Sequence, residues 1–126
     1  RLSIGNAAVQ RLVPEPEKLE QLNLEATRID SGLENWLRKA TKLNEVDLSW
    51  TKMGDGAIES LSGATKITTL WMTGTQISDQ SLAAILKMPD LESVDVQRTK
   101  VSGAGVKQLQ AGGSQLDVNP LELRTQ

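Results

Sequence analysis

Two carboxylates with an indole between them are the residues of this chain best placed to do chemistry. Asp47, Trp71 and Asp95 follow one another at intervals of 24 residues. If 24 residues make one turn of a coil, the two carboxylates lie about 10 Å apart on stacked strands. Inverting glycosidases hold their carboxylates about 6.5–9.5 Å apart, and an indole suits the flat face of a sugar. An open sheet, however, neither excludes water nor raises the pKa of one carboxylate, which a general acid needs. We therefore expect no catalysis.

A binding role fits these residues better. Trp50 and Trp71 are two of the three tryptophans in the chain, and tryptophan is enriched where proteins contact one another. Two alternatives stay open: the indoles cover each other and the sheet, or they pack against another domain. The residues that we expect to contact a partner are Trp71, Trp50, Asp47, Asp95, Glu45 and Arg98.

The composition narrows the chemistry further. The 126 residues include no histidine and no cysteine, which removes the commonest general base, the commonest transition-metal ligand and all thiolate chemistry. Asp95 and Asp117 could share a calcium ion, but they offer far fewer than the roughly six to eight oxygens that calcium takes. We expect neither metal nor cofactor. The net charge of −2 gives no general attraction to nucleic acid, and no run of about 18 apolar residues is present to span a membrane.

A repeat of 24 residues determines where these side chains lie. Five apolar or threonine columns keep this spacing through four copies. The columns are Leu19, Leu43, Ile67 and Leu91; Leu22, Val46, Leu70 and Val94; Leu24, Leu48, Met72 and Val96; Thr27, Thr51, Thr75 and Thr99; and Ile29, Met53, Ile77 and Val101. Such a period is typical of a solenoid, in which each copy forms one turn and equivalent residues stack.

Each copy predicts a strand followed by a helical return. Alternating apolar residues such as Val46 and Leu48 indicate a strand with one face turned inward. The returns carry apolar pairs at helical spacing: Leu33 with Leu37, Ile58 with Leu61, Leu82 with Ile85 and Leu86, and Val106 with Leu109. Ser78 or Asp79 is expected to cap the third return. Trp36 shares the helical spacing of Leu33, so we expect it in the core.

The threonines and glycines are expected to have structural roles. A hydroxyl both donates and accepts hydrogen bonds, so each threonine of the column is expected to bond the backbone of the loop that leaves its strand. Gly54-x-Gly56 and Gly103-x-Gly105 resemble half of a phosphate-binding loop, but the rest of that motif and its lysine are missing. We interpret these residues as turn glycines.

One period, L-x-x-L-x-L-x-x-T-x-I, resembles the leucine-rich repeat. The continuation Ile77, Ser78, Asp79, Leu82 is similar to a bacterial 24-residue subtype, and Met53, Gly54, Asp55, Ile58 matches it less well. The resemblance covers roughly residues 2 to 118. It implies an α/β fold: a right-handed solenoid with a parallel β-sheet on the concave face and helices or 3-10 turns on the convex face. The family mostly supplies binding surfaces.

The ends of the chain depart from the repeat. We expect residues 1–18 to form a partial repeat or cap, 19–113 the four repeats, and 114–126 a degenerate fifth strand and C-terminal cap or tail. In the first segment Ile4, Val9 and Leu12 can be aligned with Val101, Val106 and Leu109, and two prolines at 14 and 16 indicate an extended turn. At the other end we expect a strand over 116–118, shifted by two residues, which Asn119-Pro120 terminates; residues 121–123 would then cover the open end. Because the chain opens on arginine, we also expect it to be part of a longer protein.

The most direct functional prediction is a non-catalytic module that binds another protein through its concave face. Outward carboxylates outnumber cations there: Glu25, Glu45, Asp47, Asp95 and Asp117 against Arg98. A basic or hydroxyl-rich partner suits this balance. The lysines expected on the return side, at 39, 42, 66, 87 and 107, are interpreted as a solvated surface. The alternatives are carbohydrate binding on Trp50 and Trp71, or a structural spacer; self-association through the ends is a further alternative. The sequence does not indicate a compartment.

Overall fold

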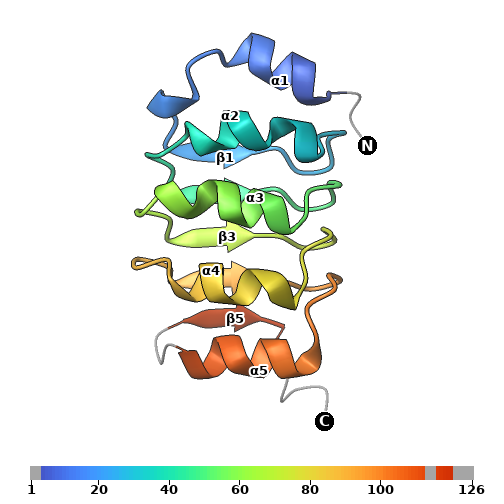
Figure 1. Ribbon diagram of the computed structural model, residues 1–126, viewed down its shortest axis with the longest axis vertical. Coiled ribbons are helices and arrows are strands. Elements are labelled where there is room, and N and C mark those ends of the chain that lie inside the picture. The colour runs from blue at the N-terminus through green and yellow to red at the C-terminus, as the bar shows by residue number, and fades with distance from the viewer. Residues whose placement is uncertain (1–3, 113–115, 121–126) are drawn as a thin grey trace.

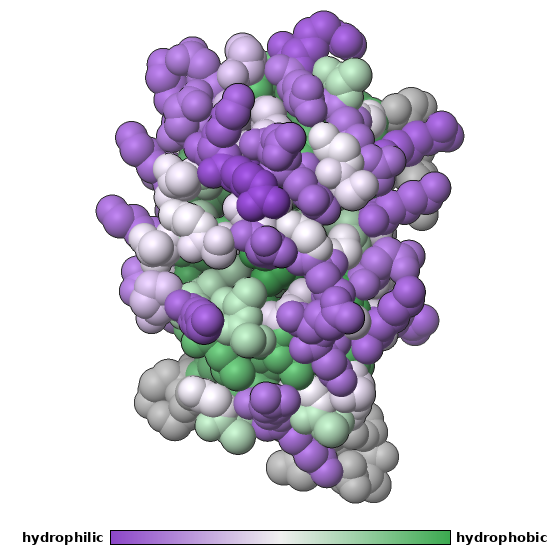
Figure 2. Space-filling view, viewed as in Figure 1, coloured by the Kyte–Doolittle hydropathy of each residue, from purple (hydrophilic) through white to green (hydrophobic). Residues whose placement is uncertain are grey.

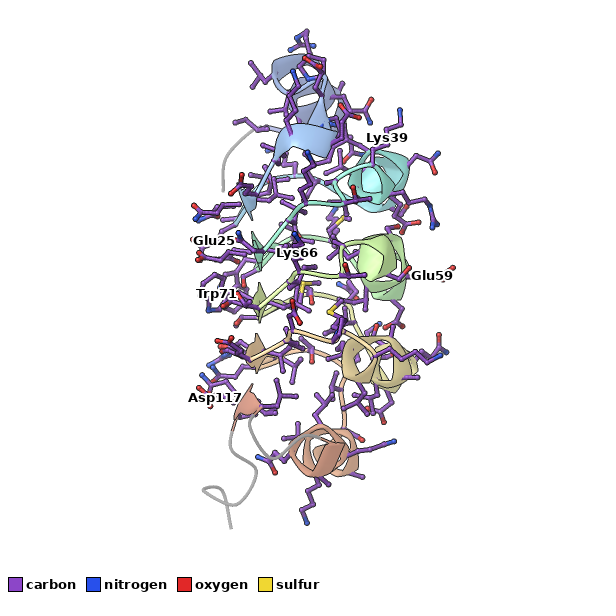
Figure 3. The ribbon with its side chains drawn as sticks, turned by 90° about the vertical axis from the view of Figure 1, so that its left-hand side faces the viewer. Glu25, Lys39, Glu59, Lys66, Trp71 and Asp117 are labelled. Carbon is purple, nitrogen blue, oxygen red and sulfur yellow. The ribbon has the colours of Figure 1, made fainter. Side chains whose placement is uncertain are left out.

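A computed structural model describes residues 4–112 and 116–120. Within these ranges five strands form one parallel sheet in the order β1-β2-β3-β4-β5, and the helices form a second layer beside it (Figures 1 and 3). The elements are α1 (Asn6–Leu12), η1 (Pro16–Lys18), β1 (Gln21–Asn23), η2 (Ser31–Leu33), α2 (Glu34–Arg38), β2 (Glu45–Asp47), α3 (Asp55–Ser60), η3 (Leu61–Gly63), β3 (Thr69–Trp71), η4 (Asp79–Ser81), α4 (Leu82–Leu86), β4 (Ser93–Asp95), α5 (Gly103–Gly112) and β5 (Asp117–Asn119).

The 24-residue period is the register of the sheet. Leu22 pairs with Val46, Val46 with Leu70, and Leu70 with Val94. One copy of the repeat is therefore one turn of the coil, as predicted. The ladder extends beyond the three-residue strands, because Leu24 donates to the carbonyl of Asp47 at 2.9 Å.

The core lies between the two layers. The inward residues of the central strands, Val46, Leu48, Leu70 and Met72, are fully buried. Each such side chain contributes about 1.5–3 kcal/mol through the apolar surface that it removes from water. The predicted helical pairs are also in this core, with Leu86 only partly buried. Three-residue strands thus persist because their inward side chains pack against the helices of their own and neighbouring turns.

The threonine column closes the turn that follows each strand. The four hydroxyls donate to the carbonyl three residues earlier, at 2.6–2.8 Å. Thr51 and Thr99 also accept from the backbone N–H groups of Met53 and Val101. The cap prediction is confirmed as well, since the Ser78 side chain accepts from the N–H of Gln80 at the start of η4.

The N-terminal segment packs as the helical half of a turn. The carbonyl of Ile4 accepts from Arg28 at 2.7 Å, and Val9 is buried. Trp36 is 6% exposed, in the core as predicted, and its Nε1–H donates to the carbonyl of Val13 at 2.9 Å. Leu12 differs from the alignment with the buried Leu109, because it is 70% exposed at the end of α1.

The position of the fifth strand differs from the predicted shift of two residues. Val118 pairs with Val94 and Asp117 with Ser93, so β5 keeps the 24-residue register and is not shifted by two residues. The shift was predicted because Leu116 and Val118 match the alternating inward pair of the earlier strands. The backbone hydrogen bonds instead keep β5 in the register of the other turns. The strand ends at Asn119, before the proline, as expected. The cap expected over 121–123 lies outside the described residues.

Two smaller expectations were also wrong. Gly56 in α3, and Gly103 and Gly105 in α5, are helical residues and not turn residues. A Cβ on Gly56 would overlap the carboxylate of Glu34, and one on Gly105 would overlap that of Asp79. Gly56 and Gly105 therefore let neighbouring turns approach closely. Pro16 begins the short 3-10 turn η1, so the segment between α1 and β1 is not extended throughout.

Candidate functional site

The outward side chains of β1–β5, with the loop residues that follow each strand, form what we call the sheet face. The predicted partner residues Glu45, Asp47, Trp71 and Asp95 all belong to it. Asp47 pairs in register with Trp71, and Trp71 with Asp95, so the indole lies between the two carboxylates as the period indicated. Figure 3 shows Trp71 pointing away from the helices, on the same side as Glu25 and Asp117.

Trp71 borders a shallow hollow on the sheet face. Its side chain is 38% exposed, and the hollow has a volume of about 460 Å³. We call this feature the Trp71 hollow; its lining residues are Gln21, Leu22, Asn23, Glu45, Asp47 and Trp71. The hollow extends from β3 across β2 to β1, because residues of all three strands line it.

Trp50 lies in the loop after β2, with a backbone φ of 60°. A Cβ placed on Gly74 would overlap the six-membered ring of Trp50, so this ring lies directly on Gly74 in the next turn. The side chain is still 45% exposed. Trp50 rests on the loop after β3, whereas Trp71 borders the hollow above β1 and β2. The two indoles therefore occupy different places on the sheet face.

Arg98 occupies the position of Trp50 two turns later, and it is exposed. Ala26, Trp50, Gly74 and Arg98 all have φ between 55° and 70°, the left-handed region that favours glycine. This shared conformation was not predicted from the sequence. Gly74 was the available signal, because one glycine in a column of a repeat can mark a backbone conformation that the whole column shares.

A second repeated feature orients the acidic side chains. Asp47 Oδ1 accepts from the N–H of Ser49 at 2.9 Å, and Asp95 Oδ1 accepts from that of Gln97 at 2.9 Å. Asn23 makes the equivalent bond to Glu25. Local bonds of this kind fix a short side chain against its own loop. Trp71 takes the same position in its turn without such a bond, so this column holds an indole among three anchored polar side chains.

The suggestion that Asp95 and Asp117 could share a calcium ion requires Asp117 to follow Asp95 in one column of the sheet, and this placement was wrong. Asp117 pairs with Ser93, while Asn119 pairs with Asp95 and its amide lies 3.5 Å from Asp95 Oδ2. Asp95 and Asp117 are thus not adjacent in one column, and the calcium arrangement that they suggested has no basis. Within residues 4–112 and 116–120, no group of three acidic side chains is arranged to hold a metal ion.

The lysines are not all on the helix side. Lys39 points outward from the helices, whereas Lys66 lies at the edge between the two layers (Figure 3). Lys42 and Lys66 line a hollow at this edge together with Glu20 and Asn44. They were predicted on the return side, but both follow the helix, in the turn that leads into the next strand.

A polar ladder at the start of the helices was not foreseen. Asp55 accepts from the N–H and hydroxyl of Ser78 and from the hydroxyl of Ser81, and Asp79 accepts from Ser102 in the same way. Burial opposes the ionisation of Asp55, but the hydrogen bonds from Ser78 and Ser81 outweigh it and hold its pKa below the ordinary value. The bonds from the Ser102 backbone and hydroxyl lower the pKa of Asp79.

The first turn has a related pair. Asn6 donates to Asp30 at 2.6 Å and accepts from the Asp30 backbone at 3.0 Å. The bond from Asn6, followed by that from the N–H of Gly32, lowers the pKa of Asp30. The signal in the sequence was the recurrence of Asn, Asp or Ser at the helix starts, where these residues accept backbone N–H bonds. Here they also join successive turns.

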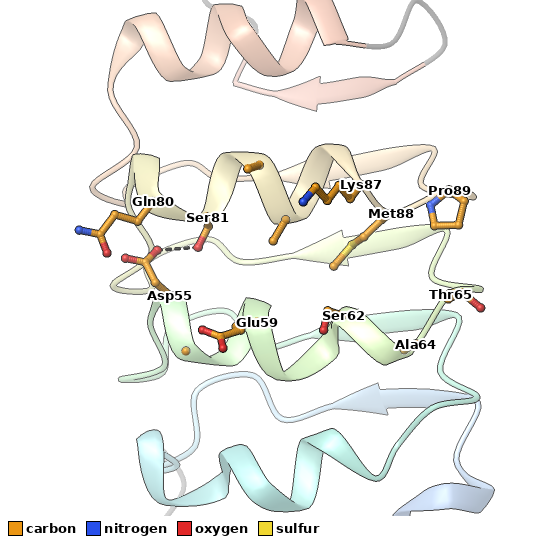
Figure 4. A pocket seen from close by; sticks show the side chains of 13 residues that line it. Asp55, Glu59, Ser62, Ala64, Thr65, Gln80, Ser81, Lys87, Met88 and Pro89 are labelled. Carbon is orange, nitrogen blue, oxygen red and sulfur yellow. Dashed lines mark hydrogen bonds between the residues drawn. The ribbon is translucent and has the colours of Figure 1, made fainter.

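A larger groove, of about 590 Å³, lies on the opposite side of the molecule between α3 and α4. Figure 4 shows Asp55 bonded to Ser81 at one end and Lys87, Met88 and Pro89 at the other. Apolar colour gathers on this side in the lower half of the molecule, around α4 and below it (Figure 2). None of the predicted partner residues lines this groove, so it is separate from the sheet face.

A single parallel sheet with one strand per 24 residues, backed by one row of helices, defines an α/β solenoid. A family model described as Leucine Rich repeat matches residues 39–62, from the end of α2 through β2 and α3. Residues 39–62 thus form a leucine-rich repeat, and neighbouring turns stack on this segment in the same register. The bacterial subtype stays a prediction.

No curated protein matches this chain in sequence. Leucine-rich-repeat domains are generally protein-interaction modules and are generally non-catalytic. None of the helices in the described part of the chain has the length and apolar character needed to cross a membrane.

Proposed function

We propose that the chain binds another protein through its sheet face, with Trp71 at the centre of the contact. The observation that carries this proposal is the exposure of two indoles on one face. Among the described residues three large hydrophobic side chains are exposed, and Trp50 and Trp71 are two of them. Tryptophans surrounded by polar groups supply much of the binding energy at protein interfaces, whereas a purely structural outward column has no need of them.

In this proposal the remainder of the chain is a rigid support. Residues 19–113 present the recognition surface, residues 1–18 cover the first turn, and residues 114–126 end the array. The contacts of Ile4, Val9 and Val13 with the first turn support the role given to the N-terminal segment. A surface on packed strands costs little to order on binding, which favours recognition without rearrangement.

The test is quantitative capture of partners by the chain and its Trp71→Ala variant. Trp71→Ala should weaken the affinity for the proposed partner by about thirtyfold or more, since truncating a central tryptophan costs at least about 2 kcal/mol. Leu12→Ala is the matched control, because Leu12 is an exposed hydrophobic residue on α1 and not on the sheet face. Proteins retained equally by the wild type and Trp71→Ala would contradict the proposal, provided that both melt at similar temperatures.

Carbohydrate binding is a second candidate, favoured by the position of Trp50. One face of its ring lies on Gly74 while the side chain stays 45% exposed, which is a platform on which a sugar ring can stack. Soluble glycans should then change tryptophan fluorescence in the wild type and not in Trp50→Ala. If the chain serves only as a structural spacer, we expect neither this fluorescence change nor the loss of a protein partner in Trp71→Ala.

A further inference from the structure

The Trp71 hollow combines an aromatic face with carboxylates from the neighbouring strand. Glu45 and Asp47 lie two residues apart on β2, about 6.6 Å along the strand. Asp47 is in register with Trp71, about 4.8 Å away across the sheet. A cation of a few heavy atoms can therefore contact the indole and both carboxylates together.

These carboxylates have no positive partner in the described structure. The ion pair found within residues 4–112 and 116–120 joins Lys18 and Glu15, and neither residue lines the hollow. Asp47 uses Oδ1 to accept from Ser49, and no described donor reaches its Oδ2. The Glu45 side chain is exposed and accepts no hydrogen bond from the described residues. Both groups are thus available to a ligand.

The opposite side of Trp71 is chemically different. Asp95 accepts from the N–H of Gln97 with Oδ1 and from the Gln97 amide with Oδ2, and the amide of Asn119 lies 3.5 Å from Oδ2. Its oxygens are already engaged by neutral donors. Trp50 stands in a column that holds alanine, glycine and arginine but no carboxylate. The combination of a free carboxylate pair and an exposed indole therefore occurs on the β2 side of Trp71.

We infer that the Trp71 hollow receives an arginine side chain from the protein partner, with the guanidinium against the indole and hydrogen-bonded to Glu45 and Asp47. This inference rests on the proposed function and adds the chemistry of the partner. A guanidinium stacks on aromatic rings and donates to carboxylates in a fixed planar geometry, whereas an ammonium is a compact and strongly hydrated charge. A metal ion is a poor alternative, because no group of three acidic residues in the described ranges is arranged to hold one.

The test is a titration followed by NMR, using the peptide acetyl-Gly-Gly-Arg-Gly-Gly-amide and its citrulline and lysine counterparts. Citrulline has nearly the shape of arginine without the charge. The arginine peptide should shift the Nε1–H signal of Trp71 and the backbone signals of Glu45 and Asp47 in a saturable way. The lysine peptide should bind more weakly, and the citrulline peptide should cause no saturable shift.

Variants separate local chemistry from overall charge. Glu45→Gln with Asp47→Asn should weaken binding of the arginine peptide by about tenfold. The double variant Glu59→Gln with Asp90→Asn removes the same charge at exposed positions away from the hollow, since Glu59 projects from the helix side (Figure 3). This control should bind as the wild type does. Trp71→Leu should remove the shifts at Glu45 and Asp47 while keeping an apolar side chain.

Equal binding of the arginine and citrulline peptides would overturn the inference, as would equal weakening by the two double variants. The proposed function is tested separately. If Trp71→Ala loses the protein partner while Glu45→Gln with Asp47→Asn retains it, the arginine inference is wrong and the protein-binding surface stands. If Trp71→Ala retains every partner, the proposed function is wrong, whatever the peptide does.

Discussion

Two columns of equivalent residues, one of threonines and one that contains Trp71, lie four residues apart in the repeat. They differ in whether every copy makes the same hydrogen bond. Thr27, Thr51, Thr75 and Thr99 all make the same bond to the carbonyl three residues earlier. The other column reads Asn23, Asp47, Trp71, Asp95 and Asn119; Asn23, Asp47 and Asp95 each accept from the N–H two residues later, whereas Trp71 has no side-chain acceptor. Where all copies do the same work, the residue holds the coil together; where one copy departs and is exposed, it is free to serve recognition.

The largest effect should come from comparing adjacent residues on β3. Leu70→Ala should cost about 2–5 kcal/mol of unfolding free energy, because it leaves a cavity in a fully buried site. Trp71→Ala, on the exposed side of the same strand, should cost less than about 1 kcal/mol. Urea denaturation of both variants measures the difference. Similar losses would show that Trp71 supports the fold and would weaken its assignment to binding.

The left-handed loop column supplies the next test. Gly74→Ala should destabilise by about 1–2 kcal/mol, because its φ of 70° is strained for an L side chain, and the added Cβ would also displace the ring of Trp50. Ala26→Gly makes the reverse change at φ 59° and should be neutral or stabilising by up to about 1 kcal/mol. Thermal unfolding gives the sign of each, and equal destabilisation by both would refute the shared conformation.

Removing one hydroxyl from the threonine column should have a moderate effect. Thr51→Val leaves the Leu48 carbonyl and the Met53 N–H without their partner in a buried site, which costs about 1–3 kcal/mol. Thr41→Val is the control, since Thr41 is exposed, and it should change stability by less than about 0.5 kcal/mol. Chemical denaturation gives the unfolding free energy of both variants. Because valine keeps the shape of threonine, a loss in Thr51→Val alone shows that the buried hydroxyl matters and the side-chain shape does not.

Acid should weaken the polar ladder at the helix starts, with the smallest effect of the four. The pKa values of Asp30, Asp55 and Asp79 lie below the ordinary value of 3.8 in the folded state, so as pH falls the unfolded chain takes up protons first. Their stabilising contribution is full above about pH 4 and is lost as pH falls through the lower folded values.

Urea midpoints measured at pH 6 and near pH 3 give the size of this loss. Asp55→Asn should show a smaller loss between the two values than the wild type. Asp90→Asn changes an exposed carboxylate outside the ladder and serves as the matched control. An unchanged acid loss in Asp55→Asn would exclude this carboxylate as its source.

The sequence predicted the coil because identical geometry in each turn demands similar residues at one spacing. The positions of Trp71, Asp47 and Asp95 followed from counting, since strand alternation leaves no choice of side once Val46 and Leu70 are inward. The register of β5 did not follow, because Leu116 and Val118 fit two alignments equally well. The exposure of Leu12 could not be predicted from the repeat either, since no repeated contact constrains the end of α1.

What the sequence determined by itself is thus the period, the inward faces and the order of side chains across the sheet. The tertiary structure decided how those side chains stand: that Trp50 lies on Gly74, that Asp95 is engaged while Asp47 keeps an oxygen free, and that a hollow opens beside Trp71. The reason is physical. Periodicity reports which residues must share an environment, whereas contacts between neighbouring turns depend on rotamers and loop conformations that only the packed molecule selects.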